Sequence, residues 1–233
     1  MTRTFRLVAL TAGLSTPSST RMLTDQLTRE SAAALSRDGS QVEVTTVELR
    51  EYAHDITDAL LTRFPSEKLA MVIEQVRAAD AIIAVTPVFN VGPSGLFKTF
   101  FDAVDMELWK NKPVLLGATA GTARHSLAID YAIRPMFSYL KSEVVSTAVF
   151  AASSDFGADT EGQADGQPLT VRVRRAAAEL ATLLQAGLGD AAADADGAAA
   201  TAGAEPAPAR GARSTLDAEF ADFVPMDRLL GRD

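Results

Sequence analysis

The sequence predicts a three-layer α/β fold in which helices cover both faces of a five-stranded parallel sheet of order 2-1-3-4-5. Five short apolar runs alternate with segments of helical periodicity, and several of these runs end in loops rich in glycine, proline or hydroxyl side chains. Parallel strands need crossover connections, which are right-handed, so this alternation places helices on both faces of one sheet. We expect residues 1–188 to form this domain.

The first strands and helix are predicted close to the N-terminus. An apolar run at 5–11 indicates a buried strand, and after a loop at 13–21 the apolar positions of 22–35 lie on one face of a helix. Residues 41–47 show an alternating pattern with β-branched side chains, which is typical of a strand, and we predict the second strand there. Apolar residues at 50–65 follow no clear period, so we predict a loop with short helical turns there.

From residue 66 onward, helices and strands alternate regularly. Pro135 lacks the amide hydrogen that a helix interior uses, so it is expected to kink or loosen the helix that contains it. The Asp- and Gly-rich residues 153–166 are typical of a surface loop or flap. Apolar stripes predict helices at 66–77, from Gly92 to about 108, at 125–141 and at 168–188, and apolar runs predict strands at 81–85, 114–119 and 144–151.

The last part of the chain has a different composition. Residues 189–213 are rich in alanine, glycine and proline and cannot bury enough apolar surface to offset chain entropy, so we predict a disordered linker. Residues 214–233 again contain aromatic and aliphatic side chains. We expect this second segment to dock on the domain or on a neighbouring subunit.

Composition excludes several kinds of chemistry. The formal net charge of −8 argues against a nucleic-acid partner, because such proteins present a basic face to the phosphates. The chain has no cysteine and only two histidines, which leaves neither a thiolate nucleophile nor a multi-histidine metal cluster. No apolar run reaches the roughly 20 residues of a membrane helix, and the N-terminus lacks a secretion signal. We therefore expect a cytoplasmic protein that takes its chemistry from a cofactor.

The loop at 13–21 is a candidate phosphate site. A helix start presents unpaired N–H groups and about half a positive charge, and hydroxyls add donors without adding repulsion. The loop matches neither of the glycine-rich nucleotide-binding fingerprints. The simpler alternative is that Ser18 or Ser19 caps the helix, but a cap needs only one hydroxyl. This loop carries five, on Ser15, Thr16, Ser18, Ser19 and Thr20.

The loop after the third strand is a candidate site for a flat ring. Strands one and three are neighbours in the predicted order, at the switch point where ligands bind, so the two loops open at the same edge of the sheet. Pro87 cannot donate to a sheet ladder and Gly92 tolerates unusual backbone angles, so this loop is expected to leave its strand sharply. A mononucleotide fits, with its ring against Val88, Phe89 and Asn90. The alternative is that Phe89 is a core residue beside an ordinary turn.

The loop after the fourth strand is predicted to contact the other edge of the same ring. Thr119, Gly121 and Thr122 offer backbone groups and hydroxyls for such contacts. Arg124 is placed to meet a second anion. We interpret His125 as a residue of the following helix start rather than as a catalytic base.

Three segments of the chain together resemble a known family. Residues 7–21, 86–98 and 117–125 are similar to the corresponding motifs of NAD(P)H-dependent FMN reductases of flavodoxin-like fold, and the middle segment is the most specific. More narrowly, the chain resembles the reductases that supply reduced flavin to luciferase-like two-component monooxygenases. The likeness covers roughly residues 4–188, and residues 220–226 resemble that subgroup too.

The resemblance implies an FMN site made from the predicted loops. Two departures are visible: Gly13-Leu-Ser replaces the commoner Gly-Ser, and Phe89 stands where tyrosine is frequent, so a hydroxyl contact is lost. The family's phosphate loop corresponds here to Ser15, Ser18, Ser19 and Thr20, and its ring loop to Pro87, Val88, Phe89, Asn90 and the region of Gly92.

The implied reaction is hydride transfer from NAD(P)H to FMN, for which no catalytic side chain and no metal is required. The resemblance also implies a homo-oligomer, a dimer or a tetramer, and a separate flavin-dependent monooxygenase as the partner. The sequence leaves three alternatives: a quinone or azo-compound reductase that keeps FMN bound, a flavodoxin-like electron-transfer module, and a scaffold whose C-terminal segment recruits a partner.

Overall fold

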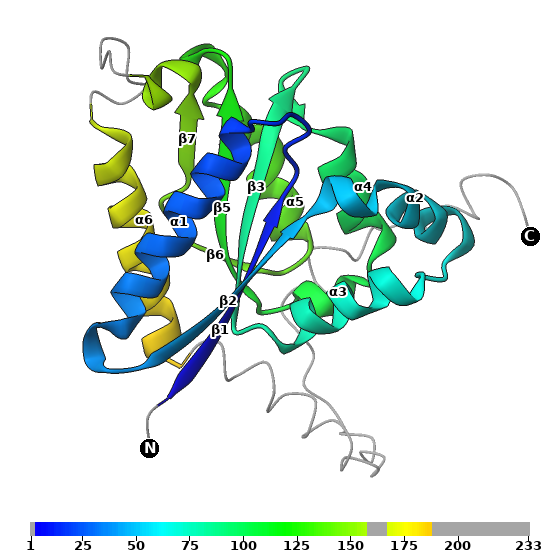
Figure 1. The fold of residues 1–233 in the computed structure, drawn as a ribbon, viewed down its shortest axis with the longest axis horizontal. Coiled ribbons are helices and arrows are strands. Elements are labelled where there is room, and N and C mark those ends of the chain that lie inside the picture. The colour runs from blue at the N-terminus through cyan, green and yellow to red at the C-terminus, as the bar shows by residue number, and fades with distance from the viewer. Residues whose placement is uncertain (1–2, 158–166, 188–233) are drawn as a thin grey trace, which may run out of the picture. The chain divides into compact units, whose positions relative to one another are not determined.

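The computed structural model describes residues 3–157 and 167–187, which contain one sheet of seven strands (Figure 1). The predicted linker 189–213 and docking segment 214–233 lie outside the described residues, as does most of the predicted flap. Every strand pair is parallel except β3 with β4. The strands are β1 (Thr4–Thr11), β2 (Gln41–Glu48), β3 (Ala81–Phe89), β4 (Gly92–Pro93), β5 (Pro113–Ala120), β6 (Glu143–Val144) and β7 (Val149–Ala152).

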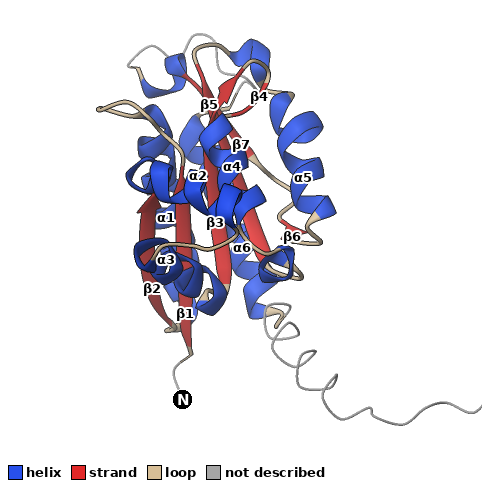
Figure 2. Cartoon of the chain, turned by 90° about the vertical axis from the view of Figure 1, so that its right-hand side faces the viewer, coloured by secondary structure: helices blue, strands red, loops and turns tan. Residues whose placement is uncertain are grey.

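Helices lie on both faces of the sheet, as Figure 2 shows from the side. The strand order is β2-β1-β3-β5-β6, and β7 pairs with β5 further along the same edge as β6. Since β5 is the predicted fourth strand and β6 with β7 is the predicted fifth, the doubly wound order 2-1-3-4-5 is confirmed. None of the helices in the described ranges has the length and apolar content needed to cross a bilayer. The α-helices are α1 (Ser19–Leu35), α2 (Ala53–Thr62), α3 (Glu67–Ala78), α4 (Gly95–Ala103), α5 (Arg134–Tyr139) and α6 (Leu169–Gln185).

The sheet separates two hydrophobic cores. In β1, Leu7 belongs to the core under α1 and α6, whereas its neighbour Val8 belongs to the core under α3 and α4. Successive side chains of a strand point to opposite faces, so a strand that is covered on both sides must be apolar at almost every position. This is why the central strands were recognisable as continuous apolar runs.

The segment 50–65 contains a regular helix of ten residues, so the prediction of a loop with short helical turns was wrong. A 3₁₀ turn at Leu49–Tyr52 leads directly into α2, which ends where Arg63 adopts a left-handed backbone with φ of 67°. Only Ile56 and Ala59 of α2 are buried. Leu61 and Phe64 are 76% and 79% exposed, and these exposed apolar residues hide the helical period of the segment.

The predicted fifth strand, 144–151, is divided into β6 and β7. Between them, Arg134 donates to the carbonyl oxygens of Val145 and Ser146, both at 3.0 Å. The carboxylate of Glu179 accepts from the backbone N–H of Thr147 at 2.8 Å and from its hydroxyl at 2.6 Å. Side chains from two helices thus take up backbone groups of the segment between β6 and β7.

The predicted helix at 125–141 is loosened, as expected from Pro135. A 3₁₀ turn at Ala123–His125 is followed by a π-helical segment at Ile129–Ile133, and only then does α5 begin, with Pro135 in its first turn. The first turn of an α-helix tolerates proline, because its N–H groups have no partner within the helix. The irregular geometry therefore lies before Pro135, in the π-helical segment.

An aromatic cluster anchors α4 to the rest of the domain. The ring of Phe101 lies 4.7 Å from that of Phe97, 4.6 Å from Trp109 and 4.9 Å from Phe137, measured between centroids. Trp109 comes from a 3₁₀ turn at Met106–Trp109 and is fully buried. The cluster therefore holds together three segments that follow β3 and β5 in the chain.

Candidate functional site

The three loops that carry the predicted site residues come together at the carboxyl edge of the sheet. Pro87 lies opposite Thr119 in the β3–β5 register, so the second and third loops start side by side. The first and third loops are joined directly, because the buried hydroxyls of Thr20 and Thr119 lie 2.8 Å apart in a hydrogen bond. Residues separated by about a hundred positions in the chain thus form one surface.

The first loop wraps tightly around Gly13. A Cβ atom on this residue would lie 2.1 Å from the Ser18 hydroxyl oxygen and 3.1 Å from the Thr20 Cβ. Ser18 caps α1 by accepting from the N–H of Arg21 at 3.2 Å, so the capping role weighed from the sequence is present. Ser15 and Ser19 remain exposed beside it.

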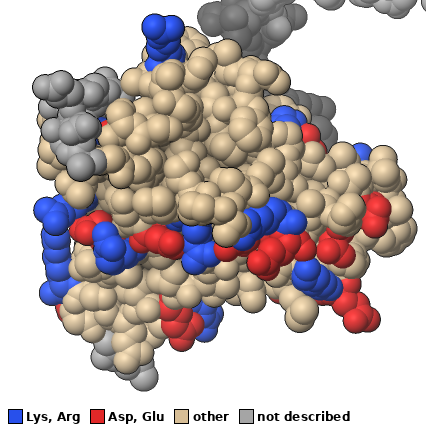
Figure 3. Space-filling view, turned by 45° about the horizontal axis from the view of Figure 1, so that its top comes forward, with Lys and Arg blue, Asp and Glu red and all other residues tan. Residues whose placement is uncertain are grey.

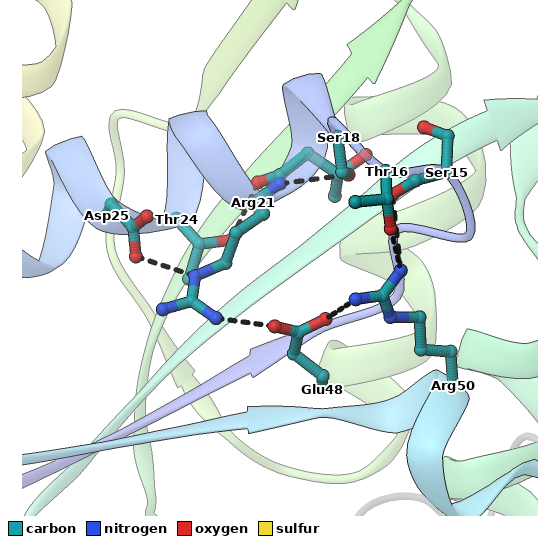
Figure 4. A network of polar contacts seen from close by, with 9 residues as sticks. Ser15, Thr16, Ser18, Arg21, Thr24, Asp25, Glu48 and Arg50 are labelled. Carbon is teal, nitrogen blue, oxygen red and sulfur yellow. Dashed lines mark hydrogen bonds and ion pairs between the residues drawn. The ribbon is translucent and has the colours of Figure 1, made fainter.

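Two arginines brace the first loop, and Figure 4 shows how Glu48 joins them. Glu48, the last residue of β2, pairs with Arg21 at 2.6 Å through one oxygen and with Arg50 at 2.8 Å through the other. Arg50 also donates to the Thr16 hydroxyl at 2.6 Å. The hydrogen bond to Asp25 raises the pKa of Arg21; burial opposes this effect, and the charge of Glu48 adds to it. The loop therefore sits beside two guanidinium groups whose charges are balanced by Glu48 and Asp25.

The second loop is a hairpin rather than a sharp exit from the strand. β3 continues through Pro87 to Phe89, and its partner β4 begins at Gly92. The left-handed residues are Asn90 and Val91, with φ of 51° and 65°, so the expectation that Gly92 supplies the unusual backbone was wrong. Positive φ at both central positions of a two-residue hairpin is typical of a type I′ turn, and Asn90 and Val91 are the two residues between the paired strands.

The hairpin presents Phe89 to the solvent and is fixed at its base. Phe89 is 47% exposed, which excludes the alternative that it is a core residue. At the base, the buried Thr86 hydroxyl accepts from the N–H of Ser94 at 3.0 Å, and Ser94 caps α4. Pro87 and Val88, between the buried Thr86 and the exposed Phe89, are half-buried.

The third loop places its predicted residues at two depths. Thr119 is buried at the end of β5, whereas Gly121 and Thr122 are exposed. Arg124 is exposed too, and His125 ends the 3₁₀ turn that follows. In the described ranges, no group of three or more His, Asp or Glu side chains is arranged to hold a metal ion.

Three residues at the site were not singled out from the sequence as site residues. Glu48 and Arg50 reach the first loop from the end of β2, and no local motif marks them. Gly13 was noted as the start of the first loop and as part of the Gly13-Leu-Ser departure, but not as a site residue. Its signal was its place as the first residue after β1 and Ala12, where the chain must turn toward α1 at close range.

Comparison with known proteins identifies the family. A model of the NADPH-dependent FMN reductases matches residues 5–157. The chain belongs to the NADPH-dependent FMN reductase family. Membership confirms the predicted oxidoreductase, with FMN and NAD(P)H as its reactants.

Individual reductases and one related structure extend the match over most of the chain. An FMN reductase (NADPH) from Pseudomonas aeruginosa is 32% identical over 183 residues, which cover 78% of this reductase and 94% of the relative. An NADH-dependent FMN reductase, SfnF from Pseudomonas fluorescens, shows the same identity and coverage. The X-ray structure of an oxidoreductase from Corynebacterium diphtheriae is 43% identical with a TM-score of 0.71, covering 78% of this reductase and 96% of that chain.

The first loop of this reductase fits a phosphate group. The N–H groups of Ser19 and Thr20 in the first turn of α1 have no acceptor within the helix. The missing side chain at Gly13 leaves room for the side chains of Ser18 and Thr20 beside it, and the exposed hydroxyls of Ser15 and Ser19 can turn toward an anion. A doubly charged phosphate is stabilised at such a helix start by its dipole and by charge-assisted hydrogen bonds.

Proposed function

We propose that this reductase holds FMN with its phosphate in the first loop and its ring between the β3–β4 hairpin and the third loop, reduces it, and passes it to a separate monooxygenase. The observation that carries the proposal is the close packing of Gly13 against Ser18 and Thr20, directly joined to Thr119. The proposed contacts are Ser15, Ser18, Ser19, Thr20, Pro87, Val88, Phe89, Asn90, Gly92, Thr119, Gly121 and Thr122.

The side chains of the site orient a ligand rather than react with it. FMN, when bound, supplies the hydride chemistry with NAD(P)H as donor. Phe89 and the half-buried Val88 offer an apolar surface for one side of a flat ring, and Thr122 offers a hydroxyl at its edge. Holding two reactants in a fixed geometry lowers the barrier for the transfer between them.

An open site favours a reductase that releases its product. Asn90, Gly121 and Thr122 are all exposed, and so is Ser19 at the phosphate end. Viewed toward the carboxyl edge of the sheet in Figure 3, the charged side chains form a belt, and the surface above it is largely uncharged. Release of reduced flavin is what a monooxygenase partner requires, whereas a quinone or azo reductase keeps its flavin.

The homo-oligomer and the cytoplasmic location stay predictions. Exposed aromatic side chains support the first of them: Tyr131 in the π-helical segment and Tyr139 on α5 are 79% and 75% exposed. Such side chains are the kind that protein interfaces bury.

Steady-state oxidation of NADH and of NADPH, each with and without added FMN, tests the activity. We expect oxidation to require added flavin, because the open site loses FMN during purification. Gel filtration after mixing with FMN then distinguishes a reductase that releases flavin from one that retains it. We expect the yellow colour to elute apart from the protein. Co-elution of one FMN per chain would favour the flavin-retaining alternative, and absence of oxidation with either nicotinamide would reject the reductase.

Replacing Ser18, Ser19 and Thr20 together by alanine tests the phosphate loop. We expect FMN to bind about 10- to 100-fold more weakly, because two or more hydrogen bonds to its charged phosphate are lost. Riboflavin has no phosphate, so its dissociation constant should change by less than about threefold. Fluorescence titration measures both constants.

The control for this variant removes three hydroxyls elsewhere. Thr57, Ser138 and Thr182 are exposed and donate only to carbonyl oxygens of their own helical segments. Their replacement by alanine should leave both flavins unaffected. Equal losses for FMN and riboflavin in the loop variant would argue against a phosphate site there.

A further inference from the structure

A buried ion pair lies beside the site but outside its loops. Arg172, on α6, has a side chain that is 7% exposed, and the side chain of its partner Asp155 is fully buried. The Nη2 atom of Arg172 lies 2.5 Å from a carboxylate oxygen of Asp155. Burying two charges is costly unless their remaining hydrogen-bonding groups are also satisfied, so the other contacts of the pair show what it holds.

The pair ties together three segments of the chain. The Nη1 atom of Arg172 donates to the carbonyl oxygen of Phe150 in β7, and its Nε atom donates to that of Gln167 at 3.2 Å. The second carboxylate oxygen of Asp155 accepts from the N–H of Ala152 at 2.7 Å. One guanidinium thus fixes the end of β7, the 3₁₀ turn at Ser153–Phe156 and the residue that leads into α6.

The end of β7 borders the third loop. Ala151 lies opposite Thr119 and Ala152 opposite Ala120 in the parallel β5–β7 register. The residues that follow Ala120 are Gly121 and Thr122. β7 has only four residues and, in the described ranges, no strand on its outer side, so the pairing with β5 and the contacts from α6 together hold it in place.

We propose that Arg172 is a positioning residue for the flavin ring: through Asp155 and the end of β7 it sets the place of Gly121 and Thr122. The proposal rests on the proposed function, because it assigns the third loop to the ring. It differs from a purely stabilising role in what it predicts for ligands. Displacing the third loop weakens contacts to the ring, which FMN and riboflavin share, and leaves the phosphate loop as it was.

Two variants separate positioning from stability. Arg172→Met combined with Asp155→Leu removes both charges, so neither is left buried without a partner, and well-packed apolar replacements of a buried pair are often tolerated. Arg172→Lys keeps the positive charge but has no planar fork to reach three acceptors. Arg174→Met is the matched control, because the Arg174 side chain is 67% exposed on the same helix and its one ion pair within the described residues is with Glu30, at 3.4 Å.

Titration of FMN and riboflavin against each variant, together with its melting temperature, tests the proposal. We expect both dissociation constants to rise about tenfold in the double variant and in Arg172→Lys, which corresponds to one lost hydrogen bond to the ring, with their ratio unchanged. The control should match the wild type.

Affinities within twofold of wild type in either folded variant would overturn the positioning role, while the loop variant at 18–20 still tests the flavin site by itself. Failure of the wild type to bind either flavin would overturn both proposals.

Discussion

Alanine in place of Gly13 is expected to weaken FMN binding about 100-fold. The new Cβ would lie 2.1 Å from the Ser18 hydroxyl oxygen, far inside contact distance. Ser18 must then rotate away, and the Thr20 Cβ at 3.1 Å prevents the loop from moving freely on the other side. Two charge-assisted hydrogen bonds to phosphate, at about 1.5 kcal/mol or more each, are lost with the loop geometry.

The same substitution should lower the stability of the protein by about 1 kcal/mol. Rotation of Ser18 removes the side chain that caps α1, and losing a serine cap costs about this amount. Isothermal titration with FMN measures the affinity and thermal unfolding measures the stability. Gly95→Ala is the control, because a Cβ on Gly95 would meet nothing within 4 Å. An FMN affinity within twofold of wild type for Gly13→Ala would place the phosphate elsewhere.

Alanine in place of Phe101 is expected to destabilise the folded protein by about 3–5 kcal/mol. Phe101 is 3% exposed, and the rings of Phe97, Trp109 and Phe137 all lie within 5 Å of its ring between centroids. Its removal leaves a cavity at the centre of the aromatic cluster that the surrounding helices cannot fill. For a domain of this size the melting temperature should fall by about 10 °C.

Denaturant unfolding measures this loss conveniently, because Trp109 is the only tryptophan of the chain and lies in the same cluster. Its fluorescence reports the unfolding of that core. Phe64→Ala is the matched control, since Phe64 is 79% exposed, and its change in unfolding free energy should stay within about 0.5 kcal/mol. Similar losses in the two variants would contradict the arrangement of the core.

The sheet and its order were predictable because burial on both faces leaves a strong pattern. Strands such as Ala81–Phe89 are apolar along nearly all of their length, and no other element tolerates this in so short a run. Helix α2 was missed because exposed apolar residues obscure its period: Leu61 lies on its solvent face and Phe64 just beyond its end. The division of the fifth strand was also hidden, since the side chains that contact the gap, Arg134 and Glu179, come from other elements, 11 and 32 positions away.

The loops of the candidate site were predictable from their residue types, but their geometry was not. A single hydroxyl before a helix is usually a cap, but several together favour an anion site, and the first loop has this second pattern. Nothing in the sequence indicates that Val91 adopts a left-handed backbone, because β-branched residues avoid it. The braces Glu48 and Arg50 depend on the β1–β2 pairing, which a local motif does not record.

The hydrogen bond between Thr20 and Thr119 has a consequence for how the protein matures. It spans 99 positions of the chain, so both hydroxyls meet only after β1, β3 and β5 have paired. A nascent polypeptide that has not yet emerged from the ribosome beyond β5 lacks half of the cradle. We therefore expect FMN, as the proposed ligand, to find its complete binding site only in a chain whose central strands are already paired.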